Sequence, residues 1–206
     1  MHIFRYILAL LVVVCVPPGV ALWLVIHPLA GFWRRLGPGW TYAILSVPTL
    51  GGIAVLFLAR RTLLGADLGT NAWLIALAIP CAAIWIVLAL RRRRRLTFRI
   101  LAGWPELSRD QPGVLLTDGI YATMRHPRYV EVVLGTASYC LIANYLGVYI
   151  VLAASMAVLY VVVLLEEREL RRRFGDAYDA YARRVPRFIP RYSRRAATKK
   201  APDDDG

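Results

Sequence analysis

Three long blocks of apolar residues, at positions 6–26, 40–59 and 72–90, constrain the fold of this chain more than any other feature. A helix needs about twenty predominantly apolar residues to cross a bilayer. Hydrophobic residues make up 58% of the chain, compared with roughly 45–50% in soluble domains. The first block follows Arg5, as in a signal peptide, but it is too long and no small-x-small cleavage site follows it. We therefore expect an all-α integral membrane protein whose residues 1–95 form a three-helix transmembrane scaffold.

Two further apolar segments, 129–142 and 148–165, are separated by so short a connection that they must form a tight antiparallel hairpin. The first segment reaches a spanning length only if its helix begins near Pro127, and proline suits the first turn because its missing N–H costs nothing there. The second segment is expected to continue as a polar helix to about Arg184 on the cytoplasmic side. These two segments bring the expected number of transmembrane helices to about five.

The organisation of the second half follows from its composition. Residues 96–117 are too polar and too rich in proline and glycine to cross a bilayer, and they predict an interfacial connector with a short amphipathic helix near 98–104. Together with the hairpin and the C-terminal helix, this connector forms a predicted catalytic region, residues 96–191. Residues 192–206 are expected to be a disordered tail.

The formal net charge of +13 does not indicate nucleic-acid binding, because the arginines cluster just outside the apolar blocks. Positive-inside bias and anionic headgroups explain such clusters. The five consecutive arginines at 91–95 fit a stop-transfer anchor, and recruitment of an anionic substrate is the alternative. Arginines on both flanks of the hairpin place these flanks in the cytoplasm. Arginine far outnumbers lysine, which indicates a GC-rich bacterial genome and hence a bacterial inner membrane.

The cysteines and histidines indicate neither a disulfide framework nor a metal site. The three cysteines lie singly inside apolar runs, and the three histidines are scattered along the chain. Metal sites and disulfide frameworks need closer or paired spacing. We expect no bound metal.

Polar residues at the mouths of the hairpin are the candidates for chemistry. Arg125-His126-Pro127 precedes the first arm, where backbone donors at a helix N-terminus favour the carboxylate of an anionic ligand. Alternatively, His126 is an ordinary interfacial residue.

Glu166 and Glu167 end the second arm, and two acids at the end of a membrane helix must face water, a partner or a ligand. Ion pairs along the helix would account for two of the acids: Glu167 with Arg171, and Glu169 with an arginine three or four residues further on. This interpretation leaves Glu166 without an explanation.

Several tyrosines accompany this cluster. Interfacial tyrosines are common in membrane proteins, but together around one polar mouth they could also wall a flat ring such as an adenine. They are Tyr121, Tyr129, Tyr178 and Tyr181.

The order of these motifs over residues 115–190 closely resembles the isoprenylcysteine carboxyl methyltransferase family, and the related phospholipid N-methyltransferases share much of the pattern. The motifs are Gly119-Ile120-Tyr121, Arg125-His126-Pro127-Arg128-Tyr129, Glu166-Glu167, Phe174-Gly175 with Tyr178 and Tyr181, and Val185-Pro186-Arg187. The resemblance implies an all-helical membrane enzyme that uses S-adenosylmethionine in a cytoplasmic pocket. The lipophilic substrate would enter that pocket from the bilayer.

The resemblance also implies roles for single residues. The cofactor-binding candidates are Tyr121, Arg125, His126, Pro127, Tyr129, Glu167 and Tyr178. The catalytic candidates are Glu166, Glu167 and Arg125. Membrane lipids and a lipophilic acceptor with a carboxylate, amine or thiol group are the implied partners.

One position departs from the family pattern. The family usually has glycine two residues after the motif tyrosine, whereas this chain has Glu131. Its carboxylate either protrudes into the pocket or pairs with Arg125 or Arg128. An amine or thiol acceptor needs a base, and Glu131, Glu166 and His126 are the available groups.

Two other functions stay open at this point. Membrane sterol-type reductases carry a similar Arg-His-Pro-x-Tyr motif and use NADPH. A non-enzymatic lipid-binding or assembly protein could retain the same fold after losing activity through changes such as Glu131. Cofactor binding separates the three functions.

Overall fold

The computed structural model describes residues 1–93 and 115–190. Within these ranges the secondary structure is helical apart from turns and one isolated antiparallel bridge between Asp67 and Tyr145. The amphipathic helix expected at 98–104 and the tail at 192–206 lie outside the described residues. The expected all-α class is confirmed.

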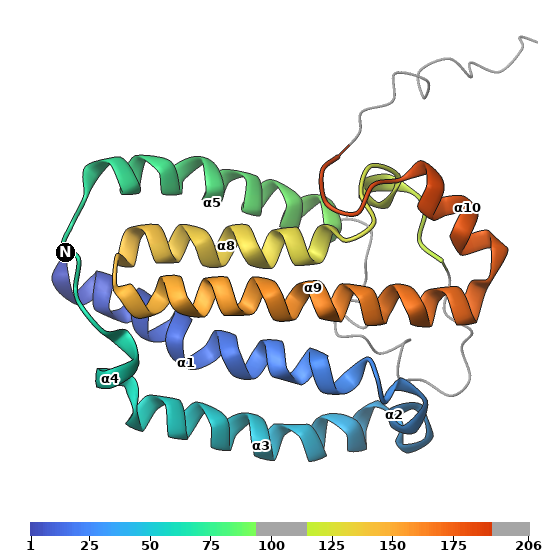
Figure 1. Cartoon of the computed structure of the whole chain (residues 1–206), viewed down its shortest axis with the longest axis horizontal. Helices are drawn as coiled ribbons and strands as arrows, with labels where there is room; N and C mark the ends of the chain where they lie inside the picture. Colours follow the sequence, from blue (N-terminus) through green and yellow to red (C-terminus); the bar gives the residue numbers. More distant parts are fainter. Residues whose placement is uncertain (94–114, 191–206) are drawn as a thin grey trace, which may run out of the picture.

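The long helices run alongside one another (Figure 1). They are α1 (His2–Ile26), α3 (Pro38–Leu58), α5 (Ala72–Arg93), α8 (Pro127–Ala143) and α9 (Leu146–Phe174). Shorter helices lie at the two ends of the bundle (Figure 1). They are α2 (Ala30–Leu36), α4 (Arg60–Leu64), the 3-10 helix η1 (Gly119–Ala122) and α10 (Asp176–Arg184).

Four helices among the described residues are long and apolar enough to cross a membrane, namely α1, α3, α5 and α9. Three of them occupy the predicted N-terminal blocks, and together they identify an integral membrane protein. The helix α8 has 17 residues and is therefore about 25 Å long at 1.5 Å per residue. A total of about five transmembrane helices, with α8 as one of them, stays a prediction.

The second arm does not continue as one helix to Arg184. It ends at Phe174, because Gly175 adopts φ +53° and ψ −130°, a conformation that glycine tolerates far better than other residues. The chain then starts the separate helix α10 at Asp176. Pro127 stands in the first turn of α8, as predicted.

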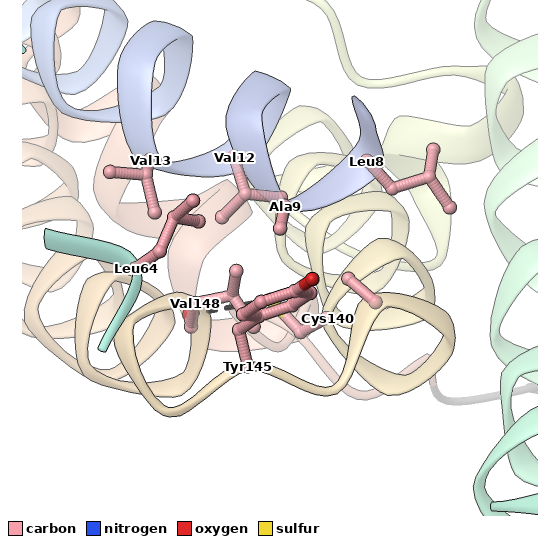
Figure 2. Packing of buried hydrophobic residues seen from close by; sticks show 9 residues of the cluster. Leu8, Ala9, Val12, Val13, Leu64, Cys140, Tyr145 and Val148 are labelled. Atoms are coloured by element: carbon pink, nitrogen blue, oxygen red, sulfur yellow. Dashed lines mark hydrogen bonds between the residues drawn. The ribbon is translucent and has the colours of Figure 1, made fainter. Parts of the chain in front are cut away.

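The largest buried cluster joins α1 and α4 to the turn between α8 and α9. Figure 2 shows Val12 of α1 and Leu64 of α4 facing Val148 and Tyr145 at the start of α9. The approach is close at Gly147, where an added Cβ would lie 1.8 Å from the carbonyl oxygen of Leu63. Only glycine fits this contact without moving the backbone of α4 or α9.

A buried polar network closes the same end of the bundle. The Nε atom of Arg5 donates to the carbonyl of Ala143 at 3.0 Å, and its guanidinium also pairs with Asp67. The side chain of Asn144 donates to the carbonyl of Gly69 at 2.9 Å. The Gly69 N–H and the Arg5 guanidinium hold the pKa of Asp67 below its ordinary value. This network ties the start of α1 to the turn that leads into α9.

The helix α8 is held on its other side by α5. An added Cβ at Gly135 would lie 3.1–3.2 Å from the indole ring of Trp85, so the ring packs directly on the α8 backbone. The ring of Trp85 also meets Tyr139 edge-on, with centroids 5.9 Å apart. The contacts with α1, α5 and α9 fix the position of α8, and with it the residues that precede α8.

Candidate functional site

The motifs at 125–127 and 185–187 meet at the end of the bundle that carries α10 (Figure 1). The backbone N–H of Arg125 donates to the carbonyl of Pro186 at 2.8 Å, and the N–H of His126 donates to the carbonyl of Arg187 at 3.0 Å. These two hydrogen bonds clamp the C-terminal segment against the start of α8. Motifs that are far apart in sequence therefore form one site.

Glu167 is the centre of this site and is only 1% exposed. Its Oε1 atom lies 2.8 Å from Nη1 of Arg125 and 3.2 Å from Nε2 of His126. Arg187 donates from Nε to Oε1 at 3.0 Å and from Nη2 to Oε2 at 2.8 Å. Arg171, the partner expected along the helix, is 3.9 Å away. Pairing along the helix is thus a minor contact, since the close partners of Glu167 come from the other two motifs.

His126 lies between the two glutamates and is 3% exposed. Its Nε2 atom is 3.2 Å from Glu167, and its Nδ1 atom is 3.6 Å from Oε2 of Glu166. Burial alone would lower the pKa of His126, but the two carboxylates outweigh burial and raise this pKa above its ordinary value. The site therefore stabilises the imidazolium form of His126 more than water does.

Two buried polar atoms at this site have no hydrogen-bond partner among the described residues, namely Nε of Arg125 and Oε2 of Glu166. Leaving such atoms unpaired costs about 1–3 kcal/mol, and more for charged groups. The Glu166 side chain is 25% exposed as a whole, compared with 1% for the Glu167 side chain, although Oε2 of Glu166 is itself buried. The nearest charged group to Oε2 of Glu166 is the His126 imidazole, at 3.6 Å, which is an ion contact longer than a hydrogen bond.

Two of the four tyrosines act as supports inside this end of the bundle. The hydroxyl of Tyr178 accepts a hydrogen bond from Nη1 of Arg125 at 3.3 Å. The hydroxyl of Tyr181 donates to the carbonyl of Tyr121 at 2.7 Å. Burial raises the pKa of both hydroxyls. Tyr178 is 1% exposed, so contact between its ring and a ligand would require neighbouring side chains to move.

An apolar cavity of about 350 Å³ lies between α8 and α9. Its lining includes Tyr129 and Val133 of α8, Leu159 and Val163 of α9, and Phe188. The rings of Tyr129 and Phe188 also flank His126, with centroids 5.7 Å and 6.1 Å from the imidazole. The cavity therefore ends beside the polar cluster, and Tyr129 belongs to both.

Glu131 pairs with neither Arg125 nor Arg128, the two partners that were expected. It accepts two hydrogen bonds from Arg92 at the end of α5, at 2.8 Å and 2.9 Å. Both side chains are buried, at 8% and 9% exposure. Arg128 instead lies over the ring of Trp23, 4.1 Å from its centroid. The reason for the error is that α5 packs along α8, which brings Arg92 closer to Glu131 than the neighbours in sequence.

Two arginines that pair with the candidate glutamates were not expected as their partners. Arg92 belongs to the run at 91–95 that was assigned to membrane anchoring, and nothing in this run distinguishes it from its neighbours. Arg187 lies in the Val-Pro-Arg motif, whose match to the family pattern was a usable signal. The structure makes it a principal partner of Glu167.

The sequence model of the phospholipid methyltransferase family matches residues 73–177. The chain is 38% identical over 88 residues to the cobalt-zinc-cadmium resistance protein CzcN of Cupriavidus metallidurans, covering 42% of this chain and 40% of that protein. It is 35% identical over 79 residues to the nickel-cobalt-cadmium resistance protein NccN of Alcaligenes xylosoxydans xylosoxydans, covering 38% and 37%. It is 32% identical over 83 residues to the protein-S-isoprenylcysteine O-methyltransferase of Schizosaccharomyces pombe, covering 40% and 35%.

The matched segments thus span well under half the length of each of these relatives. No solved structure is significantly similar to the chain. Although two relatives are named for metal resistance, residues 1–93 and 115–190 contain no group of three or more His, Cys, Asp or Glu side chains that could hold a metal ion.

Proposed function

This chain belongs to the phospholipid methyltransferase family, and on that basis we propose that it transfers a methyl group from S-adenosylmethionine to a lipophilic small molecule or lipid. The observation that best supports the proposal is that an apolar environment and a charged one meet at Tyr129. An apolar cavity between α8 and α9 ends beside the buried cluster of Arg125, His126 and Glu167. A lipophilic acceptor in the cavity would present its polar end to this cluster.

The residues at the cluster fit the proposed methyl donor. S-adenosylmethionine supplies an electrophilic methyl group on a sulfonium, attached to a zwitterionic amino acid and an adenosine. In the proposed complex the Glu166 carboxylate would meet the ammonium group, and the Arg125 guanidinium would meet the carboxylate. Tyr121 and Tyr129, beside this cluster, offer aromatic faces for the adenine.

We propose different roles for the two glutamates. Glu167 is surrounded by Arg125, His126 and Arg187 and is closed to solvent, so it acts as a positioning residue. The Glu166 side chain is 25% exposed, so Glu166 is the glutamate proposed to contact substrate. Methyl transfer depends mainly on aligning the acceptor with the methyl group in a pocket that excludes water.

The requirement for a base depends on the acceptor. A carboxylate acceptor attacks without losing a proton, whereas an ammonium or thiol acceptor must lose one. Glu131 is engaged by Arg92, which leaves Glu166 and His126 of the three candidate bases. Either of these two groups would take the proton from an amine or thiol.

The proposed site lies on the cytoplasmic side of a bacterial inner membrane. The support is the arginine-rich composition at this end of the bundle, where Arg34, Arg35 and residues 171–173 lie. Because S-adenosylmethionine is made in the cytoplasm, this orientation would give the site access to the methyl donor.

The experiment is a methyl-transfer assay on purified protein in vesicles, with radiolabelled S-adenosylmethionine and fractionated bacterial lipids. We expect label in a lipid-soluble product. We expect Glu166→Gln to lower turnover by about 100-fold if the acceptor is an amine or thiol. Asp176→Asn, which removes an exposed acid on α10, serves as the matched control and should leave turnover unchanged. Absence of labelled product together with lipid-dependent oxidation of NADPH would establish the reductase instead.

A further inference from the structure

A second cavity, of about 440 Å³, lies between α2 and α9 and differs from the first in its polar lining. The α9 residues in it are Leu165, Arg168, Glu169, Arg172 and Arg173. Their spacing of three and four residues places them on one stripe of the helix. Glu167 lies on another stripe, so the lining of this cavity is separate from the cluster around Glu167.

The charges in this lining do not balance. Glu169 is the only carboxylate among the described residues that line the cavity, and Arg34 of α2 forms an ion pair with Glu169. His27 lies 3.9 Å from the same carboxylate through Nδ1. Neither Arg168 nor Arg172 has an ion pair in the described part of the chain, and both are exposed. The lining residues that the structure describes, four arginines against one carboxylate, carry a net positive charge whatever the protonation state of His27.

The observed partner of Glu169 also excludes a simpler role for Arg168 and Arg172, that of neutralising this carboxylate. The expected pairing along the helix would have neutralised an arginine three or four residues after Glu169. The structure instead gives this carboxylate to Arg34, from a different helix. Arg168 and Arg172 are therefore not needed to balance Glu169, and their charge is available to a ligand.

The position of the cavity in the fold further limits the kinds of ligand that it could bind. Arg168, Arg172 and Arg173 occupy the last turns of α9, a helix long and apolar enough to cross the membrane. About twenty residues of α9 suffice to cross the hydrocarbon core, so its last turns would lie at the level of the lipid phosphates. Pro28, Gly31 and Leu165 add uncharged surface to the lining. Arginine binds phosphate oxygens strongly through charge-assisted and often bidentate hydrogen bonds.

We propose that the cavity between α2 and α9 is a binding site for a phosphate-bearing anion, with Arg168 and Arg172 as its principal ligands. An anionic glycerophospholipid carries this phosphate at the right depth, and soluble phosphate carries the same chemistry. His27 borders the cavity, and its Nε2 atom lies 3.4 Å from the hydroxyl of Tyr129. The site is thus adjacent to the candidate active site, but it does not depend on methyl transfer.

The test is native mass spectrometry of the detergent-purified full chain, titrated with dioleoyl-phosphatidylglycerol, dioleoyl-phosphatidylcholine or inorganic phosphate. The variant Arg168→Gln with Arg172→Gln removes two charges from the cavity. Arg183→Gln with Arg184→Gln removes two charges from exposed positions on α10 and is the matched control. The single variant Arg172→Gln covers the case in which the double variant does not fold.

We expect the cavity double variant to bind the first phosphatidylglycerol about 30-fold more weakly, and the single variant about fivefold more weakly. The control variant should match the unmodified protein. Binding of inorganic phosphate with the same arginine dependence would identify a soluble ligand for the same site, and binding of phosphatidylglycerol alone would identify a lipid. Equal weakening in the cavity and control variants, no weakening in either, or equally tight binding of phosphatidylcholine would overturn the proposal.

Discussion

The buried pair of Arg92 and Glu131 gives a quantitative prediction about stability. The two hydrogen bonds, at 2.8 Å and 2.9 Å, join the end of α5 to the first turns of α8. Removing one partner of a buried ion pair leaves the other charge uncompensated, which costs about 3–5 kcal/mol. Because both side chains retain slight exposure, we expect the lower end, about 3 kcal/mol, for Glu131→Gln. Arg92→Met should cost a similar amount.

The double variant separates the ion pair from simple packing. With both charges removed, no uncompensated charge is left, so Arg92→Met with Glu131→Gln should lose less stability than either single variant. The measurement is thermal unfolding in detergent micelles. At roughly 2–4 °C per kcal/mol for a chain of this size, each single variant should lower Tm by about 6–12 °C.

Two results would refute this reasoning. Single variants that shift Tm by less than about 2 °C would mean that water solvates the pair despite its burial. Losses that simply add in the double variant would mean that the two side chains act independently.

Two further predictions concern the backbone and the histidine. Gly147→Ala should lower the unfolding free energy by about 3 kcal/mol or prevent folding, because the new Cβ would overlap a carbonyl of α4. Gly51→Ala is the control, because the space around Gly51 is open. Equal thermal stability of the two variants would contradict the packing at Gly147. The pKa of His126 is raised in the folded state, so its contribution to stability is complete below its ordinary pKa of about 6.5 and is lost as pH rises through the folded pKa. The unfolding free energy, measured from about pH 6 to pH 9, should show this loss in the unmodified protein and not in His126→Asn. Identical pH profiles of the two proteins would exclude this contribution of His126.

The membrane helices were predictable from the sequence because their cause is local. The blocks at 6–26, 40–59 and 72–90 are long and apolar, and bilayer thickness alone dictates helices of this length. The break at Gly175 was missed because the segment after it keeps a helical pattern. One residue with positive φ was enough to split the expected helix.

The sequence predicted which residues of the candidate site lie together, but not which of them form ion pairs. The motif order placed Arg125, His126 and Glu167 in one site, and the structure brings them within hydrogen-bonding distance. Spacing along one helix favoured Arg171 as the partner of Glu167, whereas burial and tertiary contact favour Arg187. The partner of Glu131 depends on how α5 packs against α8, which no local pattern encodes.

The most direct test of the proposed function is calorimetric binding of S-adenosylhomocysteine to the detergent-purified protein, with NADPH titrated in parallel. The proposed function predicts saturable binding at one site per chain and no heat from NADPH. It also predicts that Glu166→Gln weakens this binding by about tenfold or more, because the variant removes the charge expected to meet the ammonium group. A folded protein that binds NADPH, or that binds neither compound, would contradict the assignment of this chain as an S-adenosylmethionine-dependent enzyme.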